Sequence, residues 1–507
     1  MGGATFDADV LVVGLGPVGA GLAALLARRG VSVIAFDRDT AVYPLPRAAH
    51  FDHEIMRLFQ QLGVAEAVGR EARPTPAYEF RAADGQLLLR MEASATSPSG
   101  WASGYMFHQP ALENALRERL AASDKADVRL GWRFEGLAQD ADGVTARVTG
   151  PDGAASLRGR YLVGCDGASS PVRQAIGSGL SDYGFDEPWL VLDVRVTPDS
   201  RLPEVNLQMC DPARPTTCVL MGPGRHRWEF MLLPGESTET VLDDGFIARL
   251  LERWDCGVVE VERKAVYRFH GLVADRWRAG RVLLAGDAAH QTPPFAGQGM
   301  CSGLRDAANL AWKLEAVLRG EAGEALLDTY QAEREPHSRT LIELAIGMGR
   351  VVCTLDPAMA AARDRDMLER RAAGKPSLPP RSPAPFAEGC ILAGSPGAGA
   401  LFPQPVADDG GRLDDALGDG PWLITRDAAP AGGALPAWSL SDELLAPYRA
   451  ALARWLDEHG AAAVLVRPDR YVFGAGEPAA LAAAWAEAMR APSGSGMMAP
   501  TKQAAGA

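Results

Sequence analysis

Apolar runs and one amphipathic stretch open the chain in the order strand, turn, helix, strand. Val10–Val13 is a short apolar run, a Gly-rich turn follows, and Leu22, Leu25 and Leu26 recur at helical spacing before a second apolar run. Leucines three and four positions apart indicate a helix with one covered face, and short apolar runs indicate buried strands. Residues 9–40 are therefore predicted to begin a parallel sheet covered by helices.

The middle of the chain follows another pattern. Val191–Val196 alternates between apolar and polar residues, and Trp228–Leu233 does so in part. Such alternation predicts strands with one covered face, as in an antiparallel sheet. Helical spacing predicts helices over 109–122, 299–318 and 326–352, the first with a proline in its first turn. The sequence thus predicts an antiparallel sheet inserted between segments of an α/β domain.

At 507 residues the chain is too long to fold around one simple core. A stretch rich in Pro, Ser and Gly separates a smaller C-terminal unit from the rest, and small polar residues end the chain. We predict an α/β domain formed by 1–180 and 276–372, with an excursion near 75–108 into the sheet domain; the sheet domain at 181–275; a linker at 373–388; a C-terminal domain at 389–492; and a disordered tail at 493–507.

Composition and charge narrow the range of partners. The net charge of −13 disfavours binding to nucleic acid or to anionic membranes. The seven cysteines are scattered without a CxxC pair, so neither a disulfide framework nor a zinc or other metal site is expected. The N-terminus lacks a signal-peptide pattern, and no apolar run reaches the roughly 18 residues of a membrane span. We therefore expect a cytoplasmic protein.

A glycine motif lies between the first predicted strand and helix. Gly14, Gly16 and Gly19 form G-x-G-x-x-G, and Asp37 ends the next strand. The first glycine permits a tight turn, the second lets phosphate approach the backbone, and the third lets helix and strand pack closely. The helix N-terminus stabilises pyrophosphate, and the acid can bind a ribose hydroxyl. The motif predicts dinucleotide binding; the alternatives are a tight structural turn and a surface acid.

The motif occurs once, although separate domains for FAD and NAD(P)H would each carry one. Either a nicotinamide cofactor binds alone, or FAD is resident and nicotinamide visits. A distant apolar strand ends at Gly286–Asp287, whose carboxylate can accept hydrogen bonds from sugar hydroxyls. Gly297 and Gly299 leave room for a planar ring at a helix start, which would stabilise an anionic reduced flavin. Because two distant segments are then expected to bind one large cofactor, the sequence favours resident FAD over a nicotinamide cofactor alone.

The chain resembles a known enzyme family at these motifs. Gly164–Arg173 is similar to the Asp-Gly motif of the single-component, class A FAD-dependent aromatic hydroxylases, and Gly286–Asp287 to their second FAD fingerprint; the stretch 290–312 supports the resemblance. It implies an α/β fold with a Rossmann-like FAD-binding domain, an inserted antiparallel-sheet substrate domain and a C-terminal thioredoxin-like domain. Because Cys390 stands alone, that last domain is expected to pack or dimerise rather than to exchange thiols.

The resemblance also implies a set of site residues. Pro294 would flank the flavin ring at the catalytic centre. The chemistry of His makes His290 a candidate general base, but Pro293 and Pro294 beside it favour the alternative that it packs and orients its loop. Asp166 would support both FAD and the pyridine nucleotide. The other predicted cofactor contacts are Gly14, Gly16, Pro17, Val18, Gly19, Asp37, Arg38, Arg47, Gln109, Gly286, Asp287, Gly297, Gln298, Gly299 and Met300. Candidate substrate contacts, equally expected as ordinary core or surface residues, are Gln208, Met221, His226, Phe230 and Met231.

The reaction that the resemblance implies is hydroxylation of a phenol. NADH or NADPH would reduce FAD, O2 would form a C4a-hydroperoxide on it, and OH would pass to an electron-rich ring while the protein orients the partners and excludes water. Two alternatives stay open: oxygenation of a larger polyketide-like ring, including a Baeyer–Villiger outcome, and a flavin-binding sensor or scaffold without turnover. The expected partners are a small phenol, O2 and NAD(P)H; a homodimer stays open.

Overall fold

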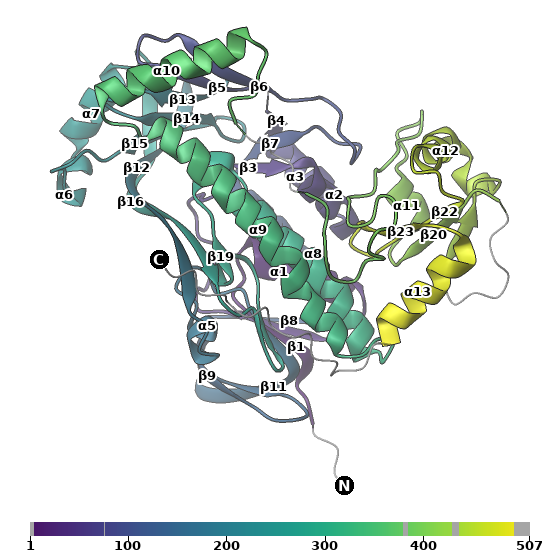
Figure 1. The fold of residues 1–507 in the computed structure, drawn as a ribbon. Coiled ribbons are helices and arrows are strands. Elements are labelled where there is room, and N and C mark those ends of the chain that lie inside the picture. The colour runs from purple at the N-terminus through teal and green to yellow at the C-terminus, as the bar shows by residue number, and fades with distance from the viewer. Residues whose placement is uncertain (1–4, 76, 379–383, 428–434, 491–507) are drawn as a thin grey trace, which may run out of the picture.

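A computed structural model gives the structure of residues 5–75, 77–378, 384–427 and 435–490. One large sheet lies at the bottom of Figure 1 and a second at the upper left, while a smaller unit, coloured green to yellow, packs on the right. The predicted linker at 373–388 lies only partly within the described residues, and the predicted tail at 493–507 lies outside them.

The lower sheet contains the parallel strands that the opening apolar runs predict. Its strands follow the order β17-β18-β11-β1-β2-β8, and β1 pairs in parallel with both β2 and β11. β10 pairs antiparallel with β11, and β9 pairs antiparallel with β10, which extends the sheet. The carboxyl ends of the parallel strands lie on the same side of the sheet, which is where α/β proteins bind cofactors. The bounds are β1 (Ala8–Val13), β2 (Val33–Asp37), β8 (Ala126–Leu130), β9 (Arg133–Gln139), β10 (Val144–Gly150), β11 (Gly153–Gly164), β17 (Arg278–Ala279) and β18 (Val282–Leu284).

The second large sheet is mostly antiparallel, in the order β19-β16-β12-β15-β14-β13-β5-β6. Its long strands β12 and β16 pair with each other, and β5 joins it in parallel with β13. On one side the sheet ends with β5 and then β6, which is the edge strand, and β19 is the edge strand on the other side. The bounds are β5 (Ala77–Ala82), β6 (Leu87–Glu92), β12 (Leu180–Ser200), β13 (Asn206–Cys210), β14 (Thr216–Leu220), β15 (Arg225–Met231), β16 (Gly257–Ala274) and β19 (His290–Gln291).

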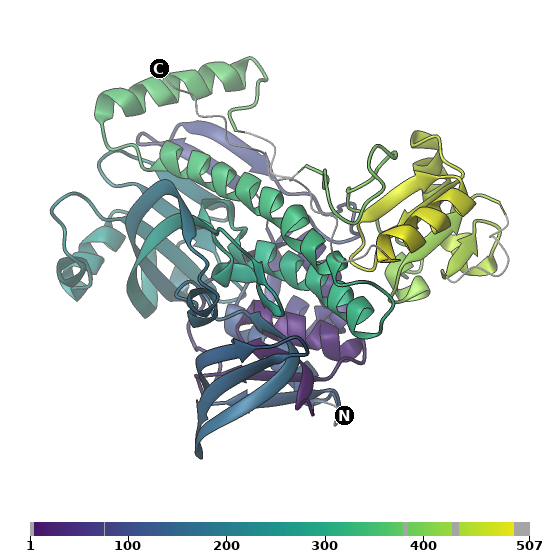
Figure 2. The same cartoon turned by 60° about the horizontal axis from the view of Figure 1, so that its bottom comes forward.

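A small three-stranded sheet and a set of helices connect the two large sheets. The small sheet has the order β3-β7-β4, and α9 runs beside α8 along the molecule from the second sheet towards the C-terminal unit (Figures 1 and 2). α4, α8 and α9 closely match the helices that periodicity predicts. The bounds are β3 (His50–Asp52), β4 (Ala72–Pro74), β7 (Gly104–Phe107), α1 (Pro17–Arg28), α2 (His53–Leu62), α3 (Ala65–Arg70), α4 (Gln109–Ala121), α5 (Pro171–Ala175), α6 (Thr238–Val241), α7 (Asp244–Glu252), η1 (Gly286–Ala288), η2 (Pro294–Ala296), α8 (Gly299–Leu318), α9 (Ala325–Val352) and α10 (Pro357–Ala372).

The C-terminal unit contains a four-stranded sheet in the order β21-β20-β22-β23, with β20 and β21 parallel and the other pairs antiparallel. It docks on α8 and α9 through a buried ion cluster, in which Arg467 and Lys313 contact Glu333 at 2.7 and 2.9 Å. The bounds are α11 (Leu413–Leu417), β20 (Trp422–Thr425), β21 (Ala437–Ser439), η3 (Glu443–Tyr448), α12 (Arg449–Glu458), β22 (Ala463–Val466), β23 (Val472–Gly476) and α13 (Pro478–Arg490).

The largest apolar core surrounds the parallel sheet and its helices, and a separate core fills the space between the second sheet and α6 and α7. The other face of that second sheet is therefore available for a site. No single helix within the described residues has both the length and the apolar composition needed to cross a membrane. The pair α9 and α10, with a bend of 117° between the two helices, passes that test by length and composition alone.

Candidate functional site

One cavity of about 760 Å³ borders both large sheets, a volume typical of ligand and cofactor sites. Its wall consists of segments that are far apart in the sequence and that the fold brings together. These segments are the turn after β1 (Gly16–Val18), parts of 47–54, the turn after β18 (Asp287), the stretch 292–300, the inner face of the second sheet, and Leu401 and Tyr471 of the C-terminal part of the chain.

The Gly-rich turn after β1 is packed tightly at two of its three glycines. Gly14 has a φ of +96°, and a Cβ there would lie 2.5 Å from the carbonyl oxygen of Cys165. A Cβ on Gly19 would lie 1.9 Å from the carbonyl oxygen of Gly14, whereas one on Gly16 would meet nothing within 4 Å. α1 begins at Pro17 without a side-chain cap. The turn therefore leaves a helix start open to an anion at the second glycine.

Asp37 ends β2 as predicted, but the cavity wall does not include it. Its carboxylate accepts hydrogen bonds from the backbone N–H of Leu15 at 2.7 Å and of Asp39 at 2.9 Å. Arg38 is exposed and also lies outside the wall. In this structure Asp37 holds the glycine turn in place, in addition to any contact with a ribose.

The 3-10 turn η1 presents Asp287 to the cavity. No described residue donates a hydrogen bond to the carboxylate of Asp287, which is exposed there. Behind the turn, the buried Asp306 accepts hydrogen bonds from the backbone of Gly286 at 3.1 Å, from His290 Nε2 at 2.7 Å and from Arg334 Nε at 2.9 Å. This cluster fixes the turn and leaves Asp287 able to accept from the hydroxyls of a bound sugar chain.

His290 belongs to that buried cluster and not to the cavity wall. Its side chain is fully buried, and its ring lies 5.2 Å from that of Trp277, centroid to centroid. Because the imidazole has no access to the cavity, the geometry gives no support to a general-base role. It agrees with the alternative that His290 packs and orients its loop.

Gln109, at the start of α4, holds the loop that carries Arg47. Its side-chain oxygen accepts hydrogen bonds from the backbone of Arg47 at 2.9 Å and of Ala48 at 2.6 Å, and its amide donates to Glu113 at 2.7 Å. Arg227 of the second sheet donates to the Arg47 carbonyl at 2.8 Å. Gln109 does line the cavity, yet these contacts occupy its polar atoms, which makes it a positioning residue.

Gln109→Leu is expected to weaken FAD binding about tenfold. Leucine fills the space but accepts no hydrogen bond, so the backbone N–H groups of Arg47 and Ala48 both lose their acceptor, at about 0.5–1.5 kcal/mol for each hydrogen bond. Titration of the apoprotein with FAD, followed by flavin fluorescence, measures the affinity. Gln86→Leu, at an exposed turn between β5 and β6, is the control. Equal FAD affinity in the two variants would contradict this role for Gln109.

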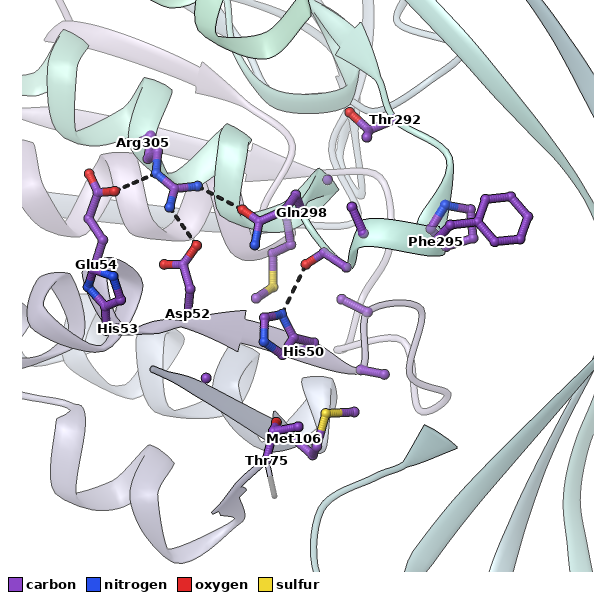
Figure 3. Close-up of a pocket in the computed structure, with 18 of the residues that line it drawn as sticks. His50, Asp52, His53, Glu54, Thr75, Met106, Thr292, Phe295, Gln298 and Arg305 are labelled. Atoms are coloured by element: carbon purple, nitrogen blue, oxygen red, sulfur yellow. Dashed lines mark hydrogen bonds and ion pairs between the residues drawn. The ribbon is translucent and has the colours of Figure 1, made fainter. Parts of the chain in front are cut away.

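Figure 3 shows Arg305 of α8 between Asp52, Glu54 and Gln298. Its guanidinium donates to these side chains at 2.5, 2.6 and 3.1 Å, respectively. Although burial opposes ionisation, Arg305 lowers the pKa of Asp52. Tyr471 of the C-terminal unit donates to Glu54 at 2.7 Å. The network thus connects that unit to the segment where α8 begins at the cavity.

The turn η2 and the start of α8 form one side of the cavity, where all of 294–300 contribute to the wall. His50 Nδ1 lies 3.2 Å from the carbonyl oxygen of Gly297, and no side chain caps α8 (Figure 3). The hydroxyls of Thr75 and Thr292 are buried in the wall without a hydrogen-bond partner among the described residues. Uncapped amides and unpaired hydroxyls need a polar ligand; a flavin ring and its side chain fit this need.

The second sheet turns a polar face towards the cavity. On β15, Arg227 and Glu229 line it, while Trp228 and Phe230 pack in the core on the other side, because side chains alternate along a strand. Burial raises the pKa of Glu229 to about 6. Thr217 on the neighbouring β14 is paired with Glu229. The cavity therefore has one side formed by the Gly-rich turn, η2 and the start of α8, and a polar side formed by the second sheet.

Of the five candidate substrate contacts, Gln208 lines the cavity and the other described candidates do not. Phe230 lies in the core behind the sheet, and His226 contacts Cys218 there at 3.0 Å, with its pKa lowered by burial to about 3. Met221 and Met231 are also buried away from the cavity. The sequence pattern identified the strand but not which of its two faces the cavity adjoins.

The structure brings most predicted cofactor contacts to the cavity and places the rest behind it. Asp166 accepts hydrogen bonds from Ser170 Oγ and from the backbone N–H of Val172 at 3.0 Å, and so supports the start of α5, which Ser170 caps. The predicted residues in the wall are Gly16, Pro17, Val18, Arg47, Gln109, Asp287, Pro294, Gly297, Gln298, Gly299 and Met300. Those outside it are Gly14, Gly19, Asp37, Arg38, Asp166, Gly286 and His290.

Sequence reasoning missed three charged residues that organise the site. Arg305 and Asp306 are adjacent charges within α8, between the buried Leu304 and Ala307. Charged residues are seldom buried without a partner, so two of them between apolar helix residues predict buried ion pairs. This pattern was present in the sequence. Glu229 gave no such signal, because alternation alone does not tell which polar position faces a cavity.

Comparison with known proteins identifies the family. A family model described as FAD binding domain matches residues 7–345. The chain belongs to this family. A second model, the HcaD C-terminal domain, matches residues 443–491. Among members of the FAD-binding family, the chain is 40% identical over 497 residues to the probable NADH-specific resorcinol 4-hydroxylase of Rhodococcus jostii strain RHA1, with 93% of this chain and 92% of the relative covered.

Further relatives are aromatic hydroxylases too. The chain is 36% identical over 512 residues to the 3-(3-hydroxy-phenyl)propionate/3-hydroxycinnamic acid hydroxylase of Mycolicibacterium smegmatis, covering 92% of this chain and 90% of the relative. The crystal structure of aklavinone-11 hydroxylase with FAD and aklavinone matches with a TM-score of 0.76 and 26% identity over 96% of this chain and 99% of that chain. These matches confirm the predicted fold class, the FAD cofactor and the aromatic monooxygenase class.

Proposed function

We propose that the protein hydroxylates a small phenolic ring. The reaction would be phenol + NADH + H⁺ + O2 → hydroxylated phenol + NAD⁺ + H2O. The observation that carries this proposal is one continuous cavity whose wall includes the Gly-rich turn, the start of α8 and the polar sheet face. NADH is proposed rather than NADPH because a relative at 40% identity is named NADH-specific.

FAD, when bound, supplies the electron transfer and the oxygen activation. The chain's own residues bind and orient. We propose that Gly16–Val18 hold the pyrophosphate at the start of α1, that Asp287 accepts from the ribityl hydroxyls, and that Pro294–Met300 flank the isoalloxazine. Gly14, Gly19 and Asp37 would shape the first turn, and Gly286 the second. The sheet would cover the reacting ring and exclude water.

We also propose the domain bounds given above, a cytoplasmic location and, for the oligomeric state, a homodimer. A larger polyketide-like substrate remains the second candidate, because a structural relative is named for aklavinone and binds it. The curated relatives named for small phenols at 36–40% identity favour the first candidate.

The test is a screen of NADH oxidation by the FAD-loaded protein with resorcinol, 3-(3-hydroxyphenyl)propionate and a polycyclic phenol. We expect a small phenol to stimulate oxidation and to yield a product heavier by one oxygen atom in mass spectrometry. Hydrogen peroxide is measured in parallel, because uncoupled cycling consumes NADH without hydroxylation. Stimulation by the polycyclic phenol alone would favour the second candidate, and no stimulation by any phenol would contradict both.

A further inference from the structure

One buried carboxylate in the cavity wall accepts no hydrogen bond from any residue that the structure describes. Glu229 on β15 is 6% exposed and lines the cavity, and no described residue donates a hydrogen bond to it. The nearest cation is Arg227, whose Nη1 lies 3.7 Å from Glu229 Oε1. A buried acceptor without a donor costs stability unless a ligand supplies one. Glu229 is therefore a candidate contact for the donor group of a substrate.

The polar neighbours of Glu229 are already paired with one another. Thr217, opposite Glu229 on β14, donates to the side-chain oxygen of Gln208 at 2.7 Å, and the amide of Gln208 donates to the hydroxyl of Tyr78. Tyr78 in turn donates to the carbonyl oxygen of Phe295 at 3.2 Å. This row leads from η2, beside the proposed flavin position, across the sheet to Glu229. Glu229 lies on the same wall and accepts no hydrogen bond from the side chains of this row.

The sheet offers no free cation to a substrate carboxylate. Arg227 donates to Asp193 at 2.6 Å and to the carbonyl oxygens of Arg47 and Pro46 at 2.8 and 2.6 Å. All three of its nitrogens are thus in use. Arg227 is the only cation among the described wall residues from this sheet, and Glu92 is a second acid there. Glu92 is exposed and pairs with Arg90 at 2.5 Å, so Glu229 is the buried acid that this sheet presents to the cavity among the described residues.

We propose that Glu229 determines substrate specificity: its carboxylate accepts a hydrogen bond from a hydroxyl of an uncharged di- or polyphenol and repels phenols that carry a carboxylate. The inference rests on the proposed hydroxylase function and narrows it. A charged acceptor forms a stronger hydrogen bond with a phenolic O–H than a neutral one does, and like charges close together in a desolvated site are strongly unfavourable. With its pKa near 6, Glu229 is mostly ionised at pH 7.

The experiment compares two probes on the FAD-loaded enzyme without NADH: resorcinol, which is uncharged, and 3-(3-hydroxyphenyl)propionate, which carries a carboxylate. Isothermal titration calorimetry at pH 7.5 (about 1.5 above the pKa of Glu229, so that it is charged) measures both dissociation constants. We expect resorcinol to bind about tenfold more tightly or better. Glu229→Gln should weaken resorcinol about tenfold and strengthen the carboxylated phenol by a similar factor.

Glu262→Gln is the matched control, because Glu262 lies on the same sheet, pairs with Arg195 and Arg225, and is not in the cavity wall. It should keep the wild-type ratio of the two constants. FAD content and thermal midpoint establish that each variant is folded, and Glu229→Met is used if the Gln variant is not. A wild-type preference for the carboxylated phenol, or a ratio unchanged in the Glu229 variant, would overturn the inference. Failure of both phenols to bind the wild type would instead overturn the proposed function.

Discussion

Gly19→Ala is expected to abolish FAD binding. A Cβ at this position would lie 1.9 Å from the carbonyl oxygen of Gly14 and 3.1 Å from the Cβ of Cys165. The first conflict is with backbone, which cannot rotate away, so the cost should exceed the about 1–3 kcal/mol of ordinary overpacking. α1 would have to move away from β1, and the site for the pyrophosphate would be lost. The ratio of flavin absorbance to protein absorbance in the purified variant measures the effect.

Two further glycine variants separate packing from cofactor contact. Gly16→Ala meets nothing within 4 Å in the protein but places a methyl group in the cavity. It should fold normally and bind FAD more weakly. Gly347→Ala, inside α9 with open space around it, should bind FAD normally and gain about 0.5–1 kcal/mol from helix propensity. A yellow Gly19→Ala protein with wild-type FAD content would refute the assigned role of this turn.

Asp306→Ala is expected to destabilise the protein by about 3–5 kcal/mol, the usual cost of leaving a buried charge unpaired. Its carboxylate and the side chains of Arg334 and His290 are all fully buried. Without it, the guanidinium of Arg334 loses its carboxylate and the backbone of Gly286 loses its acceptor. We expect a lower urea midpoint and release of FAD, because the turn that presents Asp287 would no longer be fixed.

Asp366→Ala provides the comparison for this loss. Asp366 pairs with Arg370 on α10, and its side chain is 61% exposed, so its removal should change stability by no more than about 0.5 kcal/mol. The urea midpoint of both variants is measured with and without added FAD. If the two substitutions shift the midpoint equally, the buried cluster does not stabilise the turn as described.

Patterns along the chain were sufficient to predict those parts of the structure that depend on residues close together in the sequence. The spacing of apolar residues predicted α8 and α9 to within a residue, and the glycines of the first turn predicted a tight strand-to-helix connection that the packing of Gly14 and Gly19 explains. Gly297 to Met300 were expected beside a flat ligand, and they do line the cavity. In each case the short segment that shows the sequence pattern is the same segment that forms the predicted structure.

Tertiary contacts determine what the sequence did not show. The side of β15 that meets the cavity depends on where α6 and α7 pack, so Glu229 was missed and Phe230 was considered in its place. Tyr471 reaches Glu54 from more than 400 positions away. His290 has the chemistry of a base, but the fold buries it against Asp306. None of these placements follows from spacing along the chain.

The central claim is that one cavity holds FAD and a phenol for a coupled hydroxylation. Its most direct test is the stoichiometry of turnover by the FAD-reconstituted protein: NADH consumed, hydroxylated resorcinol formed and peroxide released, measured in the same reaction. The account predicts a yellow protein that forms close to one product molecule per NADH, with little peroxide. A protein that stays colourless after reconstitution, or that oxidises NADH at the same rate with and without any phenol, would contradict it.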